Sequence, residues 1–305
     1  RPAASSIAIH PTNQPDRKAA SVSDSPDNDN MRYPRILMIY RHSLVTRLTH
    51  WLNVICLSVL LLSGLQIFNA HPELYWGHYG ADGDPAVLTI GSSGQGEYIS
   101  GFVRIAGVEV PTSGVLGVST FAGSPTPRAF PAWATIPSFQ DLATGRRWHF
   151  FFAWVFLVNG IFYLGFGILS GHFRRDLAPA RRDLSPRHLW REILDHARLR
   201  FPRGEEAKRY NALQKLTYLA VIVILLPTML LTGLTMSPGF DAIVPALVDI
   251  FGGRQSARTI HFMTATLLVL FVLVHVAMVV LSGTWNNMRS MITGRYAIRE
   301  KGPHS

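Results

Sequence analysis

The chain has 305 residues, of which 48% are hydrophobic and only 16% are charged. Soluble domains carry about a quarter charged residues, so this balance argues against an ordinary soluble protein. The formal net charge is +10, and the chain has one cysteine, Cys56. A single cysteine excludes an intrachain disulfide, a cysteine-ligated iron–sulfur cluster and a covalently attached c-type haem within this chain.

Residues 1–30 are polar, rich in Ser, Pro, Asp and Asn, and show no apolar periodicity. This composition is typical of a disordered tail, and it contains no stretch that resembles a signal peptide. Met31 opens a more structured-looking segment and is a candidate for the native first residue. We therefore expect a tail at residues 1–30, a membrane domain at residues 31–298 and a short C-terminal tail at residues 299–305.

Four apolar runs are each long enough to cross a hydrocarbon core about 30 Å thick, which takes roughly 20 helical residues. We expect transmembrane helices at residues 44–68, 148–171, 212–236 and 260–282. Four such runs in a chain of this size cannot share one soluble core. The predicted fold is an all-α membrane protein, a four-transmembrane-helix bundle. Pro227 predicts a kink in the third span, and we find no internal repeat.

The Lys and Arg residues gather between spans two and three and beside both ends of the membrane domain. The loop at residues 70–145 holds only Arg104 and Arg128. Because Lys and Arg mark the cytoplasmic side, both termini and the middle loop are expected to be cytoplasmic. The positive charge is then explained by topology, and nucleic-acid binding is not expected.

The outer loop at residues 70–145 is too long for a simple connector. Its Gly-rich turns and short β-like runs, at residues 101–110 and 114–121, predict a small irregular or β-containing cap. The middle loop, at about residues 172–210, has helical character around residues 186–198. We expect it to lie along the inner membrane surface.

Four of the twelve histidines lie in or at the start of the apolar spans, where ionisable side chains are costly and usually functional. His261 and His275 share span four and are 275 − 261 = 14 residues apart. That spacing is ~21 Å along a helix and brings both side chains within ~40° of one direction. The depth of His149 in the membrane matches that of His261, and the depth of His50 matches that of His275. We therefore predict two bis-imidazole haems, stacked across the bilayer, with these four histidines as ligands of the haem iron.

An iron with two imidazole ligands has no open site, which suits electron transfer. Arg47, Arg147 and Arg258 lie beside the ligands and are candidates to bind haem propionates, although flanking arginines also anchor helices at lipid head groups. Small residues would let the macrocycle or a neighbouring helix approach closely; they are Gly64, Gly160, Gly165, Gly167 and Gly171. A lone intramembrane histidine is often only a helix–helix hydrogen-bond partner, whereas four at paired depths favour haem.

Three segments resemble the bacterial di-haem cytochromes grouped with cytochrome b561 and with the cytochrome b subunit of nickel–iron hydrogenases. They are R-L-T-H-W-L-N at 47–53, G-R-R-W-H-F-F-F-A-W at 145–154 and A-R-T-I-H-F at 257–262, followed by His275. The resemblance covers most of residues 40–298. It implies two b-type haems, quinone as electron donor or acceptor, and a place in the bacterial inner membrane.

A finer resemblance lies in H-P-E-L-Y-W-G at 71–77, Q-K-L-T-Y-L at 214–219 and W-N-N-M-R-S-M-I-T-G-R-Y at 285–296. These segments are similar to those of members that accompany a molybdopterin oxidoreductase of the sulfite-oxidase type. The implied function is electron transfer between the quinone pool and a periplasmic partner, either that enzyme or a hydrogenase. Tyr75 and Trp76 have an alternative interpretation as an aromatic belt at the membrane interface.

Two other functions stay open at this point. One is a stand-alone quinone-coupled oxidoreductase, such as a superoxide oxidase, as in some compact relatives. The other is a transporter or channel whose histidines relay protons or bind metal. The long outer loop favours docking of a partner over an autonomous enzyme.

Overall fold

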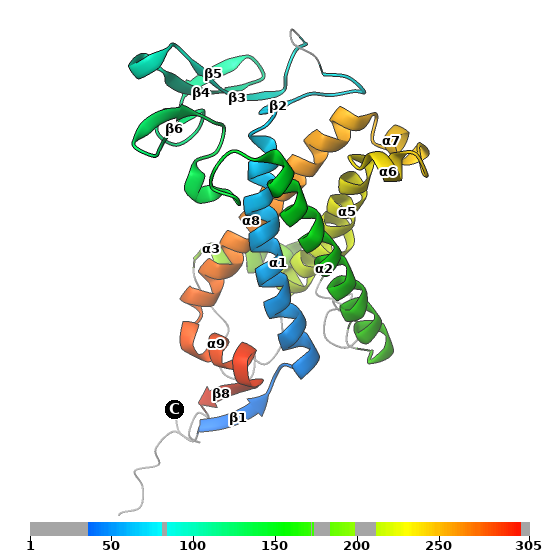
Figure 1. Ribbon diagram of the computed structural model, residues 1–305. Coiled ribbons are helices and arrows are strands. Elements are labelled where there is room, and N and C mark those ends of the chain that lie inside the picture. Colours follow the sequence, from blue (N-terminus) through cyan, green and yellow to red (C-terminus); the bar gives the residue numbers. More distant parts are fainter. Residues whose placement is uncertain (1–35, 81–83, 172, 174–183, 199–211, 300–305) are drawn as a thin grey trace, which may run out of the picture.

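The structure is a computed structural model that describes residues 36–80, 84–171, 173, 184–198 and 212–299 (Figure 1). The predicted tail at residues 1–30, the candidate start at Met31 and residues 300–305 lie outside the described residues. So do residues 172, 174–183 and 199–211 of the predicted middle loop.

Within the described residues, four helices are long and apolar enough to cross a membrane. They span Leu44–Phe68 (α1), Leu142–Leu169 (α2), Leu213–Thr235 and Arg254–Leu281 (α8). This confirms the predicted fold class of a helical membrane bundle. The second and fourth helices begin before residues 148 and 260, where the apolar runs start, because their first turns are polar and extend beyond the apolar stretch.

The first two spans start at side-chain caps. The Ser43 hydroxyl accepts a hydrogen bond from the Thr46 backbone N–H at 3.1 Å. The Asp141 carboxylate accepts hydrogen bonds from the Thr144 hydroxyl at 2.7 Å and from the Thr144 N–H at 3.1 Å. These bonds hold the pKa of Asp141 below its usual range, so the cap is complete near neutral pH and is lost as the pH falls through that lowered pKa. This N-cap interaction of Asp141 fixes the start of α2 two turns ahead of His149.

The third span is not one regular α-helix. It consists of α4 (Ala212–Ala220), a π-helical segment (Val221–Leu225) and α5 (Leu226–Thr235). Pro227 has no backbone N–H, and its ring crowds the carbonyl group four residues earlier. The π-helical turn directly before α5 accommodates this ring, so the predicted kink takes the form of a local widening of the helix.

The spans form two closely packed pairs. α1 packs on α2 and α5 packs on α8, whereas α8 makes few close backbone approaches to α1 or α2. The β-rich segment at residues 73–134 lies at one end of the bundle, which we call the cap end (Figure 1). The opposite end, which we call the base end, carries strands β1 and β8. The two helix pairs therefore meet mainly through side chains.

The cap consists of two antiparallel β units. One is a four-stranded sheet in the order β2–β3–β4–β5, and the other is the β6–β7 hairpin. The strands are Glu73–Leu74, Leu88–Ser93, Ser100–Ile105, Val108–Pro111, Val118–Phe121 and Ser124–Pro127, with short 3₁₀ helices at Gly96–Tyr98 and Ala132–Ala134. A buried cluster joins Phe68 of α1 to Leu74, Ile90 and Ala129 of the cap, and Phe262 of α8 packs against it. The cap is thus built onto the bundle.

The segment at residues 71–77 ties the cap to the start of α8. The Thr259 hydroxyl donates to the Tyr75 carbonyl at 2.6 Å, and the Gly77 N–H donates to the Ser256 hydroxyl at 2.7 Å. Tyr75 is 3% exposed and Trp76 is 54% exposed. The aromatic-belt interpretation therefore fits Trp76 but is wrong for Tyr75, which is a buried packing residue.

The base end joins the two ends of the described membrane domain. β1 (Ile36–Tyr40) pairs antiparallel with β8 (Arg295–Arg299). α9 (Thr284–Thr293) returns toward α1, where the Trp51 indole N–H donates to the Met291 carbonyl at 3.1 Å. In the part of the chain that the structure describes, the remaining helices are α3 (Pro186–Ala197), α6 (Pro238–Asp241) and α7 (Ala246–Ile250).

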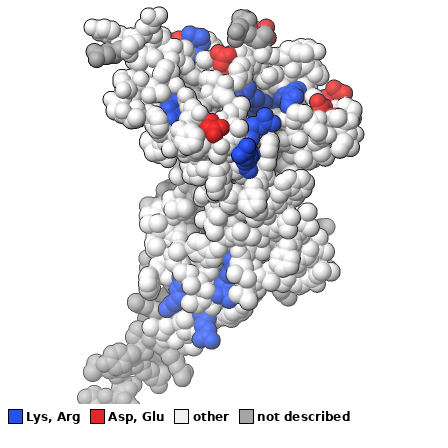
Figure 2. Space-filling view, in the orientation of Figure 1, with Lys and Arg blue, Asp and Glu red and all other residues white. Residues whose placement is uncertain are grey.

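Charge is distributed unevenly along the molecule. The face shown in Figure 2 has a belt across the middle of the bundle without Lys, Arg, Asp or Glu. On this face the cap end shows basic and acidic side chains, whereas the base end shows only basic ones. Because Lys and Arg are enriched on the cytoplasmic side, a cytoplasmic base end remains the expected orientation.

Arg128 holds part of the cap together from inside. It is 4% exposed, and its guanidinium donates to the Phe130 carbonyl at 2.7 Å, the Ser138 carbonyl at 2.9 Å and the Thr135 hydroxyl at 3.0 Å. Burial lowers the pKa of Arg128. Arg128→Met removes all three bonds, each worth about 1.5 kcal/mol or more to a charged donor, so we expect it to destabilise the cap by roughly 3–5 kcal/mol.

The matched control is Arg104→Met. It breaks an exposed ion pair with Glu109 at 2.6 Å, which should cost no more than about 1 kcal/mol. Hydrogen exchange of the cap amides measures both effects. Equal protection of these amides in the two variants would contradict the role given to Arg128.

Candidate functional site

Four histidines from three helices form two ring pairs inside the bundle. At the cap end, the ring centres of His149 on α2 and His261 on α8 are 6.4 Å apart, with 62° between the ring planes. At the base end, His50 on α1 and His275 on α8 also have centres 6.4 Å apart and 62° between planes. These are the two pairs that the depths of the histidines along the spans predict. Their role as ligands stays a prediction.

Both pairs fit two imidazoles that coordinate one metal from opposite sides. A metal–imidazole bond is about 2 Å long, so the two nitrogens would be about 4 Å apart and the ring centres, each about 1 Å farther out, about 6 Å apart. Within the described residues, no three or more His, Cys, Asp or Glu side chains form a group that could hold a metal ion. A zinc site takes three or four protein ligands, whereas haem takes only axial ones. The donor sets therefore fit haem.

His149 lies on α2, and its ring contacts α1, the helix that packs on α2. Its Nδ1 lies 3.1 Å from the Ser63 hydroxyl oxygen and 3.1 Å from the Leu60 carbonyl oxygen. Next to Ser63, a Cβ added to Gly64 would lie 3.4 Å from His149 Cε1, so glycine lets the ring lie flush against the helix. With Nδ1 engaged, Nε2 is the nitrogen left for a metal.

His261 is held in the same way by α5. Its Nδ1 lies 3.0 Å from the Thr232 hydroxyl oxygen. A Cβ added to Gly233 would lie 3.4 Å from His261 Cε1. The two cap-end rings thus have equivalent surroundings, supplied by different helices.

This equivalence has a short sequence signature. Residues 61–65 read L-L-S-G-L, and residues 230–234 read L-L-T-G-L. The likeness is limited to these five residues, and the expectation of no internal repeat stays a prediction. Thr232 and Gly233 were missed as site residues, and the shared hydroxyl–glycine pair was the signal that could have found them.

The predicted glycines differ in their surroundings. Gly64 contacts a site histidine, whereas Cβ atoms added to Gly160 or Gly165 would meet nothing within 4 Å. A Cβ added to Gly167 would collide with the Phe173 ring, and Gly171 has a positive φ of 67°. Only Gly64 of this set therefore borders a histidine pair.

Gly64→Val tests how closely the ring must approach α1. The branched side chain would displace His149, and we expect haem affinity at the cap end to fall roughly 10- to 100-fold, as for other changes next to metal ligands. Gly160→Val is the control, because its site has open space. Haem titration of both variants measures the effect, and equal affinities would rule out the packing role of Gly64.

The base-end histidines pack mainly against aromatic side chains. The Phe271 ring stacks on His275 with centres 5.9 Å apart, and the Trp51 ring meets His50 edge-on at 5.5 Å. Among the described residues, neither His50 nor His275 has a hydrogen bond to its ring. The two histidine pairs therefore match in spacing and differ in their support.

Two buried arginine nitrogens lie in the base-end elements. The Nε atoms of Arg47 on α1 and Arg289 on α9 are buried, and neither has a hydrogen-bond partner among the described residues. Arg47 also donates to the Ile292 carbonyl of α9, which fixes its helix against α9. The Arg289 guanidinium also donates to the Asn286 side chain at 2.6 Å, so of its buried nitrogens only Nε is left over among the described residues. Unpaired guanidinium nitrogens in these elements fit an anionic group such as a haem propionate. Arg289 was missed from the sequence, because nothing in the local pattern shows that α9 returns to α1.

The other two predicted arginines lie at the cap end. Arg147 is exposed in the first turns of α2, two residues before His149. Arg258 donates to the His71 carbonyl, and its guanidinium carbon lies 5.6 Å from the centre of the Phe68 ring. Arg258 is thus already bound to the junction of bundle and cap, whereas Arg147 is the more available cation.

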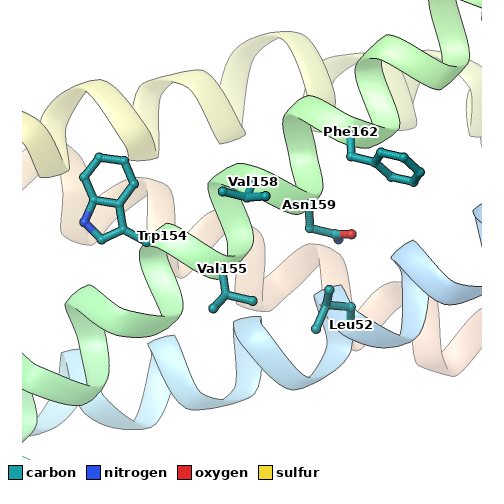
Figure 3. A pocket seen from close by; sticks show the side chains of 6 residues that line it. All are labelled: Leu52, Trp154, Val155, Val158, Asn159 and Phe162. Carbon is teal, nitrogen blue, oxygen red and sulfur yellow. The ribbon is translucent and has the colours of Figure 1, made fainter.

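An apolar groove of about 470 Å³ lies between α1 and α2 (Figure 3). It is lined by Leu52, Trp154, Val155, Val158, Asn159 and Phe162. The buried Asn159 amide donates to the Asn53 side chain at 2.7 Å and to the Thr49 carbonyl at 3.0 Å, which ties α2 to α1. No histidine lines this groove, so it is separate from both ring pairs.

Two comparisons with known proteins bear on the family of this chain. The family model of prokaryotic cytochrome b561 matches residues 41–294. A protein of Azospira oryzae, described as "Putative protein-methionine-sulfoxide reductase subunit YedZ1", is 28% identical over 235 residues, which cover 77% of this chain and 87% of that protein. Cytochromes of the b561 family are helical membrane bundles that bind b-type haem. The chain belongs to the prokaryotic cytochrome b561 family and is an integral membrane protein that binds b-type haem.

Proposed function

We propose that the chain is a di-haem electron-transfer subunit, which carries electrons between the quinone pool and an oxidoreductase docked at the cap end. The supporting observation is the two histidine pairs, with equal ring separations of 6.4 Å. Both include a histidine of α8, and these two residues are 275 − 261 = 14 positions apart, ~21 Å along the helix. Sites at this spacing reach from one half of the bilayer to the other.

Haem supplies an iron that changes between the ferric and ferrous forms by one electron. His149 and His261 would hold it at the cap end, and His50 and His275 at the base end. With two imidazoles from the protein at each haem, neither site would leave a position open for oxygen or another small substrate. The protein's task is then to hold, insulate and tune two electron carriers.

We favour a periplasmic molybdopterin oxidoreductase as the partner, with a hydrogenase as the second candidate. The name of the Azospira oryzae relative supports a reductase partner, and so electron flow from quinol toward the cap end. One quinol gives two electrons and two protons and becomes quinone. Reduction of one sulfoxide takes up two electrons and two protons and yields a thioether and water, so the reactions balance.

The orientation belongs to the same proposal. The base end is cytoplasmic, and the membrane is the bacterial inner membrane, as the distribution of Lys and Arg supports. The cap, whose surface includes exposed aromatic residues such as Tyr98 and Trp133, is then the periplasmic surface available to the partner.

Arg289→Gln tests the anionic site at the base end. Loss of one charge-assisted hydrogen bond, worth about 1.5–3 kcal/mol, should weaken haem binding there by about tenfold or more. The midpoint potential of the remaining base-end haem should fall, because a positive charge favours the reduced form. Arg295→Gln, an exposed change at the same end, is the control. Equal haem affinity and potentials in both variants would remove Arg289 from the site.

Two alternatives are weaker. A quinone-coupled superoxide oxidase would act without a partner protein. Such an enzyme would not need the folded cap as a docking surface. A metal-binding transporter would need more protein ligands than two histidines for each site, and none joins either pair among the described residues. Superoxide turnover by the purified chain alone would favour the first alternative.

The proposal is tested by purifying the chain from its native membrane together with whatever remains bound. We expect a periplasmic oxidoreductase to co-purify and quinol to reduce the haems, as seen in the b-type absorption bands. The partner's substrate, added in its oxidised form, should then reoxidise these haems. Haem bands that quinol does not reduce, in a chain that binds no oxidoreductase, would contradict it.

A further inference from the structure

The two histidine pairs differ in what lies behind their rings. Each cap-end ring has its Nδ1 within hydrogen-bond distance of a hydroxyl oxygen, Ser63 for His149 and Thr232 for His261, and Nδ1 of His149 also meets the Leu60 carbonyl. The base-end rings have no such bond among the described residues. Which nitrogen carries the proton at the cap end can be worked out from these contacts.

The Ser63 hydroxyl has one proton, and a nearer acceptor takes it. Its oxygen lies 2.6 Å from the Val59 carbonyl, four residues earlier in α1, and 3.3 Å from the Leu60 carbonyl. The hydroxyl therefore donates to Val59 and faces His149 with its lone pairs. Since the Leu60 carbonyl can only accept, both groups at Nδ1 are acceptors, and Nδ1 of His149 must carry the proton.

Thr232 repeats this arrangement on α5. Its hydroxyl oxygen lies 2.6 Å from the Thr228 carbonyl and 3.3 Å from the Met229 carbonyl, the same two distances as for Ser63. The hydroxyl proton goes to Thr228, so the Thr232 oxygen accepts from Nδ1 of His261. The two cap-end rings thus share one tautomer, with the Nε2 lone pair free.

We propose that Ser63 and Thr232 are positioning residues that fix the Nδ1–H tautomer of both cap-end ligands and lower the reduction potential of the haem between them. This inference rests on the proposed function. Acceptors on Nδ1–H fix the orientation of a ligating imidazole and raise its basicity. A more basic ligand would stabilise ferric iron relative to ferrous iron, and this would lower the reduction potential of the haem. Without matching acceptors, the base-end haem lacks this contribution.

The test uses Ser63→Ala and Thr232→Val in the full-length, haem-loaded chain. Each removes one acceptor behind a ring and leaves both histidines of the pair in place, so we expect both haems to be retained. The midpoint potential of one haem should rise in a redox titration, and it must be the same haem in both variants, because His149 and His261 serve one iron. The double variant should shift this potential further, and the other haem should keep its potential.

The matched controls remove the same kind of hydroxyl group from exposed positions on α1 and α8. Ser58→Ala removes an exposed hydroxyl that donates to the Val54 carbonyl of α1 at 2.8 Å, and Thr266→Val removes one that donates to the Phe262 carbonyl of α8 at 2.9 Å. Both should leave the two potentials unchanged. Ser63→Thr should keep the low potential, since threonine already occupies the equivalent place on α5.

Unchanged potentials in Ser63→Ala and Thr232→Val, with two haems bound, would overturn this inference and leave the di-haem proposal standing. Shifts of different haems by the two variants would overturn it as well. If Ser63→Ala loses a haem, Ser63→Thr must retain it, and loss in both contradicts the role of the acceptor. A wild-type chain with fewer than two haems would instead defeat the proposed function.

Discussion

His261→Ala and His275→Ala should each remove one b haem, and each a different one. The two residues lie on one helix but belong to different ring pairs, cap-end and base-end. A haem held by only one histidine of its pair would bind weakly, while the other pair is ~21 Å away and unaffected. The haem content, measured as extracted haem relative to protein concentration, should therefore fall from about two haems per chain to about one.

The pattern across four variants makes this result specific. His149→Ala should lose the same haem as His261→Ala, and His50→Ala the same haem as His275→Ala, as judged by which midpoint potential disappears. The exposed His78 provides the control, and His78→Ala should keep both haems. Unchanged haem content in both α8 variants would defeat the ligand assignment.

The second large effect is expected on electron transfer across the membrane. If electrons pass from quinol through the base-end haem to the cap-end haem, His275→Ala interrupts the chain of carriers while the cap stays intact. Quinol-driven turnover of the bound partner should fall by more than about 100-fold, beyond the range typical of changes next to a metal ligand. Vesicles that contain the complex and a reduced quinone provide the assay.

A soluble artificial donor that reduces the partner directly is the control for this assay. With that donor, turnover should be the same in the His275→Ala and wild-type complexes, because the partner itself is unchanged. Quinol-driven turnover that survives loss of the base-end haem would show that electrons enter at the cap end, and the transmembrane route would be wrong.

Much of this architecture is readable from the sequence, because hydropathy and helical spacing are local properties. Four apolar runs predict four spans, and the 14-residue interval in α8 predicts which histidines share a depth. The early starts of α2 and α8 are less visible, since their polar first turns resemble loop. Asp141 with Thr144 is a capping signal that places the start of α2 where the structure has it.

The features that were missed depend on contacts between distant segments. Ser63 and Thr232 sit in apolar runs, where a hydroxyl beside a glycine looks like ordinary helix packing. Only the approach of α2 to α1 and of α8 to α5 turns these hydroxyls toward histidines. Arg289 lies on α9, which folds back on α1, and the strand order of the cap follows from pairings that no single segment encodes.

The most direct test of the account is the haem content of the purified wild-type chain, measured as extracted haem b against protein by amino-acid analysis. Two histidine pairs with the same 6.4 Å ring separation predict about two b haems per chain and two midpoint potentials. One haem per chain, or a chain that folds fully without haem, would contradict it.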